Sequence, residues 1–274
     1  MKSVAIVIPV YKESLAEAEK TAFAQCLQVL KERDIVLVAP KRLNLSSYIN
    51  YAESCGKSLR VKFFGKDFFE GIAGYNRLMQ SLSFYQSFSD YTYILVYQLD
   101  AYIFFDDLDI WIEQEYDYVA APWFEDYGSY EEGKHLWQVG NGGFSLRRVA
   151  FFIQQIKKKR WLSYRRLCEY YSSDSYLNHL YMLFRAASGY KNNFNFWQKQ
   201  AGMNEDYFWS VFLQNIGVSV RIPTPIQAIA FAFEKSPTYL FRINGNKLPM
   251  GCHAWMKYEY DSFWKNYILC NRNL

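Results

Sequence analysis

The chain has 274 residues, of which 51% are apolar and 21% charged, and its formal net charge is +4. This composition excludes an intrinsically disordered chain and supplies a large core. No apolar stretch approaches the ~20 residues that span a bilayer. The N-terminus lacks a signal-peptide pattern, and the five scattered cysteines include no C-x-x-C pair. The sequence therefore predicts a cytoplasmic protein.

Aromatic residues are unusually frequent, with 24 Tyr, 22 Phe and 8 Trp making up 20% of the chain. Flat rings pack in cores, and they also present apolar faces to sugars, nucleobases and partner proteins. The composition therefore leaves two interpretations open, an aromatic-rich core or a cleft lined by rings.

The first part of the chain alternates between strand and helix patterns. The β-branched run 4–8 predicts a strand, and Ser14 with Glu17 predicts a capping box at the start of an amphipathic helix. Further strands are expected at 35–38, 59–63, 93–97 and 116–121, with a long helix over 72–88. The alternation predicts an α/β fold with a mostly parallel central sheet flanked by helices.

Beyond residue 125 the pattern becomes irregular. We expect a short strand at 142–146, helices near 148–159, 175–187 and 205–215, and an apolar run at 228–233. The sequence therefore predicts one domain over 1–274 with two halves, a regular one over 1–125 and an irregular one over 126–274.

Polar residues follow the first and fourth of these strands. The segment Pro9 to Glu13 ends one strand and Asp100 follows the other, and ligands of open α/β sheets bind beyond the carboxyl ends of the strands. Asp100 is placed where Mg²⁺ or Mn²⁺ bridging two phosphates could bind. A turn or helix-capping aspartate is the alternative interpretation.

Four common catalytic motifs are missing from the sequence. It contains no G-x-G-x-x-G, no P-loop, no H-E-x-x-H and no G-x-S-x-G, which disfavours dehydrogenases, P-loop enzymes, zinc proteases and lipases. Only three histidines are present, so carboxylates are the more available acid and base groups.

The first half resembles the GT-A glycosyltransferases. Ile8-Pro9-Val10-Tyr11-Lys12-Glu13 is similar to the strand end that holds the nucleotide in that family. Tyr75-Asn76-Arg77 resembles its Ala-Arg-Asn region, and Leu99-Asp100-Ala101-Tyr102 resembles its Asp-x-Asp segment. The resemblance implies a Rossmann-related GT-A-like fold, with residues 1–125 binding a nucleotide-sugar.

Three later motifs resemble the same enzymes. The segment 141–147, Asn-Gly-Gly-Phe-Ser-Leu-Arg, is similar to an acceptor-site segment, Asn204-Glu205-Asp206 to the segment of the catalytic base, and Gly251-Cys252-His253-Ala254-Trp255 to a metal-binding histidine segment. The set most resembles an uncharacterised bacterial group labelled only as a domain of unknown function. In that group Gln-Leu-Asp-Ala, Gly-Gly-Phe-Ser and Cys-His-Ala-Trp recur.

The resemblance implies site residues and a chemistry. Asp206, or else Glu205, is the base that deprotonates the acceptor hydroxyl, which implies inversion at the sugar. Asp100 and His253 are the metal ligands for Mg²⁺ or Mn²⁺. The remaining substrate-binding residues are Pro9, Tyr11, Glu13, Asn76, Arg77, Asp100, Trp123, Gly142 and Gly143.

Several of these residues have a structural interpretation as well. Glu205 and Asp206 are also favoured as acids in the first turn of a helix. His253 and Trp123 could be core residues, and the Gly142-Gly143 pair an ordinary turn, although two glycines also allow a ligand to approach the backbone closely.

The sequence also departs from the Asp-x-Asp pattern. Tyr102 or Gln98 stands where a second carboxylate is found in the family, which leaves metal dependence open. Arg77 is the alternative cation for the diphosphate.

The stretch from Arg147 to Arg166 holds eight basic residues and no acidic one. It is either a solvated helix end or a contact with anionic lipid at the inner membrane face, where a lipid-linked acceptor is found. The small net charge and the lack of a recognition motif argue against nucleic acid.

Together these patterns predict a glycosyltransferase that transfers a sugar from a nucleoside-diphosphate donor to a glycan or lipid-linked acceptor in surface polysaccharide synthesis. A non-catalytic glycan- or partner-binding protein of the same fold is the main alternative. A nucleotidyltransferase is the third, although the segment from Pro9 to Glu13 lacks the glycine-rich loop that this chemistry needs.

Overall fold

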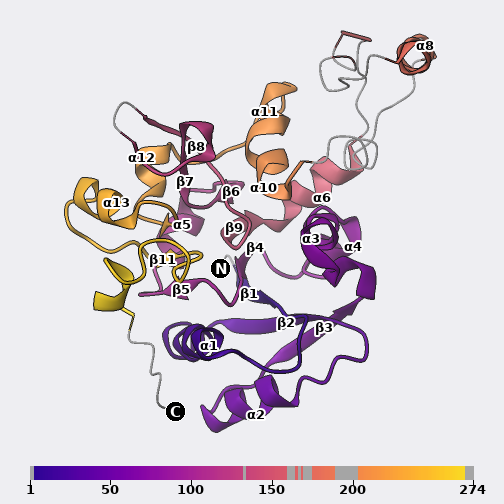
Figure 1. Cartoon of the computed structure of the whole chain (residues 1–274). Helices are drawn as coiled ribbons and strands as arrows, with labels where there is room; N and C mark the ends of the chain where they lie inside the picture. The colour runs from indigo at the N-terminus through magenta and orange to yellow at the C-terminus, as the bar shows by residue number, and fades with distance from the viewer. Residues whose placement is uncertain are drawn as a thin grey trace.

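The computed structural model describes residues 3–131, 134–158, 164, 165, 168, 175–188 and 203–268. Its centre is a six-stranded sheet in the order β3-β2-β1-β4-β9-β6 (Figure 1). β3, β2, β1 and β4 are parallel, and β9 runs antiparallel to both of its neighbours. The strands are β1 (Val4–Pro9), β2 (Asp34–Pro40), β3 (Arg60–Phe64), β4 (Tyr93–Tyr97), β6 (Tyr118–Val119) and β9 (Phe144–Arg148). The predicted α/β fold with a mostly parallel sheet is confirmed.

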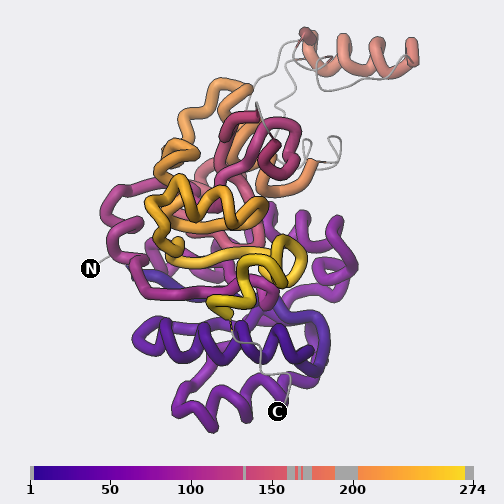
Figure 2. Tube along the Cα trace, turned by 60° about the vertical axis from the view of Figure 1, so that its left-hand side comes forward, coloured from indigo at the N-terminus to yellow at the C-terminus, as the bar shows by residue number. Residues whose placement is uncertain are grey.

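Helices cover both faces of this sheet (Figure 2). Alternate side chains of β1 face two separate cores, Ala5 and Val7 one of them and Ile6 and Ile8 the other. The first core is covered by α3 (Gly71–Met79), α4 (Leu82–Gln86) and α6 (Val149–Lys157). The second is covered by α1 (Glu17–Val29), α2 (Ser46–Ser54) and α5 (Leu108–Glu113). Strands buried on both faces account for the nearly continuous apolar runs in the sequence.

Two predicted helix details are wrong. α1 begins at Glu17, and the carboxylate of Glu19, instead of that of Glu17, accepts a hydrogen bond of 2.8 Å from the N–H of Ala16. The predicted helix over 72–88 is interrupted between α3 and α4, because the Ser81 hydroxyl accepts from the N–H of Phe84 and so caps a new helix.

Outside the central sheet lie two small sheets, each combining strands from before and after residue 125, and several short helices. One sheet contains β10 (Ala232–Phe233), β11 (Gly251–Cys252) and β5 (Tyr102–Ile103), and the other β7 (Pro122–Phe124) and β8 (Leu136–Val139). The helices are α8 (Tyr176–Ala187), α10 (Glu205–Tyr207), α11 (Leu213–Asn215), α12 (Pro225–Ala228) and α13 (Pro237–Ile243). Short 3₁₀ turns lie at Lys66–Phe69, Glu125–Tyr127 and Trp264–Asn266.

The predicted helix over 205–215 is present, with one irregular turn. α10 continues through a π-helical turn at Phe208–Phe212 into α11. The predicted strand 142–146 instead begins at Phe144, since Gly142 and Gly143 form a turn before it. The predicted strand 116–121 is reduced to Tyr118–Val119.

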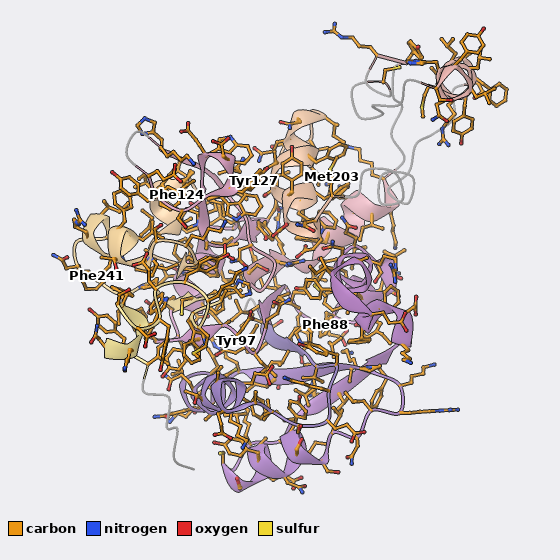
Figure 3. All side chains as sticks on the ribbon, in the orientation of Figure 1. Phe88, Tyr97, Phe124, Tyr127, Met203 and Phe241 are labelled. Carbon is orange, nitrogen blue, oxygen red and sulfur yellow. The ribbon has the colours of Figure 1, made fainter. Side chains whose placement is uncertain are left out.

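The aromatic residues mostly form cores. Phe88 and Tyr97 lie in the body of the molecule on opposite sides of the sheet, whereas Phe124 belongs to β7 and Phe241 to α13, outside the central sheet (Figure 3). A third core, centred on Trp255 and Trp264, joins β5, β10 and β11. None of the described helices is both long enough and apolar enough to cross a membrane.

Candidate functional site

The ends of β1 and β4 form the floor of the candidate site. The two strands are parallel neighbours, so Pro9 and the turn Gln98–Asp100 reach the same edge of the sheet. The turn is closed by a hydrogen bond of 2.9 Å from the N–H of Ala101 to the carbonyl of Gln98. Asp100 is thereby placed at this edge, as the sequence predicts.

A cavity of about 440 Å³, here called pocket 1, opens beside these strand ends. Its walls combine rings with a few polar groups: the Tyr48 hydroxyl donates to the carbonyl of Lys12, and the Lys12 ammonium lies 2.7 Å from Glu19. The lining residues are Pro9, Val10, Tyr11, Lys12, Glu19, Tyr48, Phe68, Phe69, Gly71, Ile72, Tyr75, Gln98, Leu99 and Asp100. The volume is that of an ordinary small-molecule site.

A second cavity, pocket 2, has a volume of about 530 Å³ and shares Ile72, Tyr75 and Gln98 with pocket 1. Its other lining residues are Asn76, Trp123, Tyr127, Asn141, Gly142, Gly143, Asn204, Glu205, Asp206, Tyr207, Glu234, Lys235, His253 and Tyr258. The structure thus brings carboxylates and an imidazole from late in the chain to the edge formed by the strand ends. Ten of the predicted site residues line one pocket or the other.

The Gly142-Gly143 turn is closely approached by the side chains of Glu205 and His253. A Cβ added at Gly142 would lie 2.0 Å from Oε1 of Glu205, and one added at Gly143 would lie 2.0 Å from Nε2 of His253. The N–H of Gly143 donates to Oδ1 of Asn141, which itself has a φ of 130°. Glycine is therefore needed at both positions to make room for these two side chains. Both glycines also line pocket 2, and the approach of a ligand to them stays a prediction.

Glu205 is held by a buried ion pair. Arg147 donates from both terminal nitrogens to its two carboxylate oxygens, over 2.8 and 2.9 Å, and both side chains are at most 2% exposed. Burial raises the pKa of Glu205, an effect that the guanidinium opposes. Arg147 also donates to Ser145 and to the Tyr85 hydroxyl. Arg147 is therefore not part of any surface for lipid, and that part of the sequence prediction is wrong.

The carboxylate of Asp206 is held differently from that of its neighbour. Its Oδ1 accepts a hydrogen bond of 2.8 Å from the N–H of Tyr207 while the side chain lines pocket 2. Burial raises the pKa of Asp206, and the backbone N–H groups of Tyr207 and Gly142 partly counteract this. A carboxyl group with a raised pKa in a cleft is suited to accept a proton near neutral pH.

His253 connects the strand ends with the later carboxylates. Its Nε2 lies 3.2 Å from Asp100 and 3.2 Å from the Gln98 amide oxygen, and its Nδ1 lies 3.2 Å from Glu234. Burial alone lowers the pKa of His253, but the carboxylates of Asp100 and Glu234 outweigh it and raise the value to about 10. Burial likewise opposes the charge of Asp100, yet His253 lowers the pKa of Asp100 below 3.8.

Asp100, Gln98 and His253 are side chains of types that bind divalent cations, His253 only in its neutral form. Two ligands bound at right angles at about 2.1 Å lie about 3 Å apart, and Nε2 of His253 is 3.2 Å from oxygens of both Asp100 and Gln98. Within the described ranges no three His, Cys, Asp or Glu side chains are grouped as metal ligands. The amide oxygen of Gln98 is the other polar group at this distance from the imidazole.

Three residues predicted to bind the donor do not line pocket 1. Asn76 accepts from the N–H of Glu205 and donates to Asn204, so it fixes the start of α10 beside pocket 2. Arg77 is exposed and donates to the carbonyl of Asp67, and Glu13 is exposed. Arg77 and Glu13 line neither pocket, so the structure gives no support to the phosphate contact expected of Arg77.

Trp123 lines pocket 2 with little exposed surface. Its ring packs over Gly140, where an added Cβ would lie 2.1 Å from it, and meets the Tyr127 ring edge-on at 5.1 Å. It is 9% exposed. Trp123 therefore forms part of the wall of pocket 2 and packs against Tyr127 there.

The family described as Protein of unknown function (DUF5672) matches residues 58–253, which include Asp100, Glu205, Asp206 and His253. The chain belongs to this family. No curated protein matches the sequence.

Solved structures that are similar to this DUF5672 protein include three glycosyltransferases. Apo mouse xyloside xylosyltransferase 1 is 11% identical over 92% of this chain and 97% of its own, with a TM-score of 0.49. The galactosyltransferase LgtC, in complex with donor and acceptor sugar analogs, is 11% identical over 91% and 86%, with a TM-score of 0.45. Core-mannan synthase A from Aspergillus fumigatus, in its Mn/GDP form, is 10% identical over 75% and 71%, with a TM-score of 0.41. All three scores lie below 0.5.

Two charged residues of the candidate site, Glu234 and Arg147, are absent from the residues predicted from sequence. Glu234 directly follows the apolar run 228–233, so the rule that singled out Asp100 applies to it equally. Arg147 was assigned to a basic surface stretch, although Ser145 and Arg147 alternate with Phe144 and Leu146 as one face of a strand. The apolar run before Glu234 and the alternation around Arg147 are therefore both visible in the sequence.

Proposed function

We propose that the protein is a glycosyltransferase that moves a sugar from a nucleoside-diphosphate donor to a hydroxyl of a glycan or lipid-linked acceptor. The observation that carries the proposal is the pair of adjoining pockets, with Asp206 in one and Asp100, Gln98 and His253 at their junction. The resemblance of the motif order to GT-A glycosyltransferases supports it.

In this proposal pocket 1 holds the nucleotide. Tyr11, Phe68 and Phe69 supply apolar ring surface for a base, and the Lys12–Glu19 pair and the Tyr48 hydroxyl supply polar contacts. All residues that line pocket 1 come from 9–100, which supports a division into a donor half over 1–125 and an acceptor half over 126–274.

We further propose that Asp100, His253 and Gln98 hold Mg²⁺ or Mn²⁺ between the pockets. When bound, the ion neutralises charge that develops on the departing diphosphate. The protein contributes the positions of the donors: the turn after β4 fixes Gln98 and Asp100, and Glu234, whose carboxylate lies 3.2 Å from Nδ1, orients the imidazole.

Asp206 is the proposed base. A sugar hydroxyl bound in pocket 2 transfers its proton to the Asp206 carboxylate as its oxygen attacks the anomeric carbon, and the nucleoside diphosphate leaves from the opposite face, which inverts the configuration. Glu205 cannot share this role equally, since both of its oxygens are occupied by Arg147. Its proposed role is to anchor α10.

A non-catalytic glycan-binding protein remains the second candidate. The observation that favours it is Tyr102, which stands where the family resemblance calls for a second carboxylate and is instead buried against Trp255. One carboxylate fewer weakens the hold on a cation.

The test is release of nucleoside diphosphate from a panel of nucleotide-sugars with Mn²⁺ or Mg²⁺. We expect slow hydrolysis of one donor by the full chain and a loss of about 10²–10⁴-fold in Asp206→Asn. The matched control is Asp261→Asn, which removes a carboxylate that is 84% exposed. Glycan binding without release from any donor contradicts the proposal and supports the second candidate. Full turnover in Asp206→Asn removes the base assignment alone.

The setting of the reaction is also part of the proposal. We place the protein in surface polysaccharide synthesis in the cytoplasm, at the inner membrane face when its acceptor is lipid-linked. The exposed side chains of Lys157 and Lys158, from the basic stretch, support the contact with lipid.

A further inference from the structure

Tyr127 presents an exposed ring to pocket 2. It is the last residue of the short turn at Glu125–Tyr127, which follows β7 (Figure 3). The side chain lines the pocket and is 41% exposed, while the rings of Trp123 and Trp137 pack edge-on against it at 5.1 and 5.2 Å. Part of the ring is therefore fixed by its neighbours, and the rest is available to a ligand in the cavity.

The backbone of this turn also holds the ring in place. Asp126 and Tyr127 have φ values of 57° and 54°, in the left-handed region that is unfavourable for residues other than glycine. Such a conformation persists only where the surrounding structure holds it, and it is concentrated at ligand sites. The Lys235 ammonium donates to the carbonyl of Tyr127, and Lys235 itself lines pocket 2. The turn is thereby held against the wall of the cavity before any ligand binds.

Polar groups that can bind sugar hydroxyls share the pocket with this ring. The ring of Tyr207 is 6.1 Å from that of Tyr127, and Tyr207 directly follows Asp206, the proposed base. Burial, Tyr207 and the charge of Asp206 raise the pKa of Tyr127 to about 12, which keeps its side chain neutral. Glu234 and Asn204 line the same pocket. Pocket 2 therefore combines ring surface with several polar groups.

This combination indicates the class of ligand. A pyranose has C–H groups that pack against an aromatic ring, and hydroxyls around its edge that need hydrogen-bonding partners. An acyl chain in the same space would strip water from the carboxylate of Asp206 and offer it no new hydrogen bond, which is costly. The wall of pocket 2 is therefore suited to a sugar.

We propose that Tyr127 is a specificity-determining residue on which a pyranose of the acceptor stacks, with one of its hydroxyls directed at Asp206. Both residues line pocket 2. The acceptor is then recognised by a sugar ring, whatever that ring is attached to. Calling this sugar the acceptor rests on the function proposed above, whereas the contact between the sugar and Tyr127 does not.

The test is binding of the methyl glycosides of glucose, galactose, mannose and N-acetylglucosamine to the full chain, titrated by saturation-transfer NMR without a donor. We expect one of these glycosides to bind. Tyr127→Asn is expected to weaken its binding about tenfold, because the ring is lost while asparagine tolerates the left-handed backbone. Tyr127→Phe, which keeps the ring, is expected to bind the glycoside like the wild type.

Tyr267→Asn is the matched control, because Tyr267 is 37% exposed, packs against the rings of Phe241 and Phe263, and lines neither pocket 1 nor pocket 2. It is expected to bind like the wild type, and thermal unfolding verifies that each variant is folded. Equal glycoside binding by the wild type and the folded Tyr127→Asn variant overturns the proposal. A wild type that binds none of the glycosides overturns it as well.

Release of nucleoside diphosphate from the donor panel, measured in parallel, reports on the proposed function separately. Release by the wild type together with undiminished glycoside binding in Tyr127→Asn overturns the contact with Tyr127 alone. Weakened glycoside binding in Tyr127→Asn without release from any donor supports that contact and contradicts sugar transfer.

Discussion

The two pockets adjoin but are built in opposite ways. Pocket 1 is a mostly apolar cleft whose rim is formed by exposed side chains. Tyr11 is 63% and Ile72 is 74% exposed. Pocket 2 is backed by the buried Arg147–Glu205 pair and by the charged cluster around His253. Exposed apolar side chains contribute little to stability, whereas a buried charge without its partner is very costly. Changes at the exposed rim of pocket 1 should therefore affect mainly ligand binding, and changes at the buried charged groups of pocket 2 should affect folding as well.

The largest effect is expected from Arg147→Met. It leaves the Glu205 carboxylate buried without its counterion, at a cost of about 3–5 kcal/mol in the free energy of unfolding, measured by urea denaturation. Lys20→Met, which breaks the exposed pair with Glu17, should cost under about 1 kcal/mol. The double variant Arg147→Met/Glu205→Leu should recover most of the loss. Equal losses in Arg147→Met and Lys20→Met would show that the buried pair behind pocket 2 contributes no more to stability than an exposed one.

Gly143→Ala is expected to cause the second largest loss of stability. Its Cβ would displace the imidazole of His253, and overpacking of this kind costs about 1–3 kcal/mol. Gly128→Ala is the control, because its Cβ would meet the flexible end of Lys134 at 3.3 Å. Thermal unfolding of the two variants measures the difference. Equal stability would show that His253 is free to move aside.

The pH profile of turnover probes Asp206. Burial raises the pKa of Asp206 above the ordinary aspartate pKa of 3.8. On acidification the carboxylate is therefore protonated at a higher pH than an exposed aspartate. Below that point the rate should fall about tenfold per pH unit, equivalent to about 1.4 kcal/mol. Initial rates from pH 4 to pH 8 measure it. A rate that is flat down to the ordinary value removes Asp206 as the base.

Asn76→Ala should have a smaller effect on stability than on turnover. It removes the acceptor for the N–H of Glu205, which costs about 1 kcal/mol, and it loosens the start of α10 next to Asp206. Arg77→Ala, one residue along and exposed, is the comparison and should change stability by under about 0.5 kcal/mol. Denaturation and rate measurements on both variants separate the two positions.

Tyr11→Ser is the smallest expected change in stability. The ring is largely exposed, so the free energy of unfolding should shift by under about 0.5 kcal/mol, while nucleotide affinity measured by calorimetry falls. A large loss of stability would show that the rim of pocket 1 is part of the core. Unchanged nucleotide affinity would show that the nucleobase does not bind against Tyr11.

The sequence predicted the regular half well because its signals are local. The runs at 4–8, 35–38 and 93–97 are strands, and the position of Asp100 follows from the rule that parallel strands end at one edge. The break between α3 and α4 was missed, because the apolar stripe continues through Ser81 while its hydroxyl starts a new helix.

The contacts of pocket 2 could not be predicted from local sequence patterns, because they join residues far apart in the chain. The pairing of Arg147 with Glu205 joins residues 58 positions apart, and that of His253 with Gln98 joins residues 155 apart. A motif marks Glu205 and Asp206 as candidates, yet only the fold decides which carboxylate is bound by the guanidinium. The purpose of the two glycines became visible only with their neighbours in place.

The Tyr75 hydroxyl donates to the carbonyl of Gly142 over 3.1 Å, and the same side chain belongs to the walls of both cavities. The next residue of α3, Asn76, is bonded to the first residue of α10. α3 is therefore hydrogen-bonded to the glycine turn and to α10, and it contributes to the walls of both cavities. A displacement of this one helix would move walls of both cavities together.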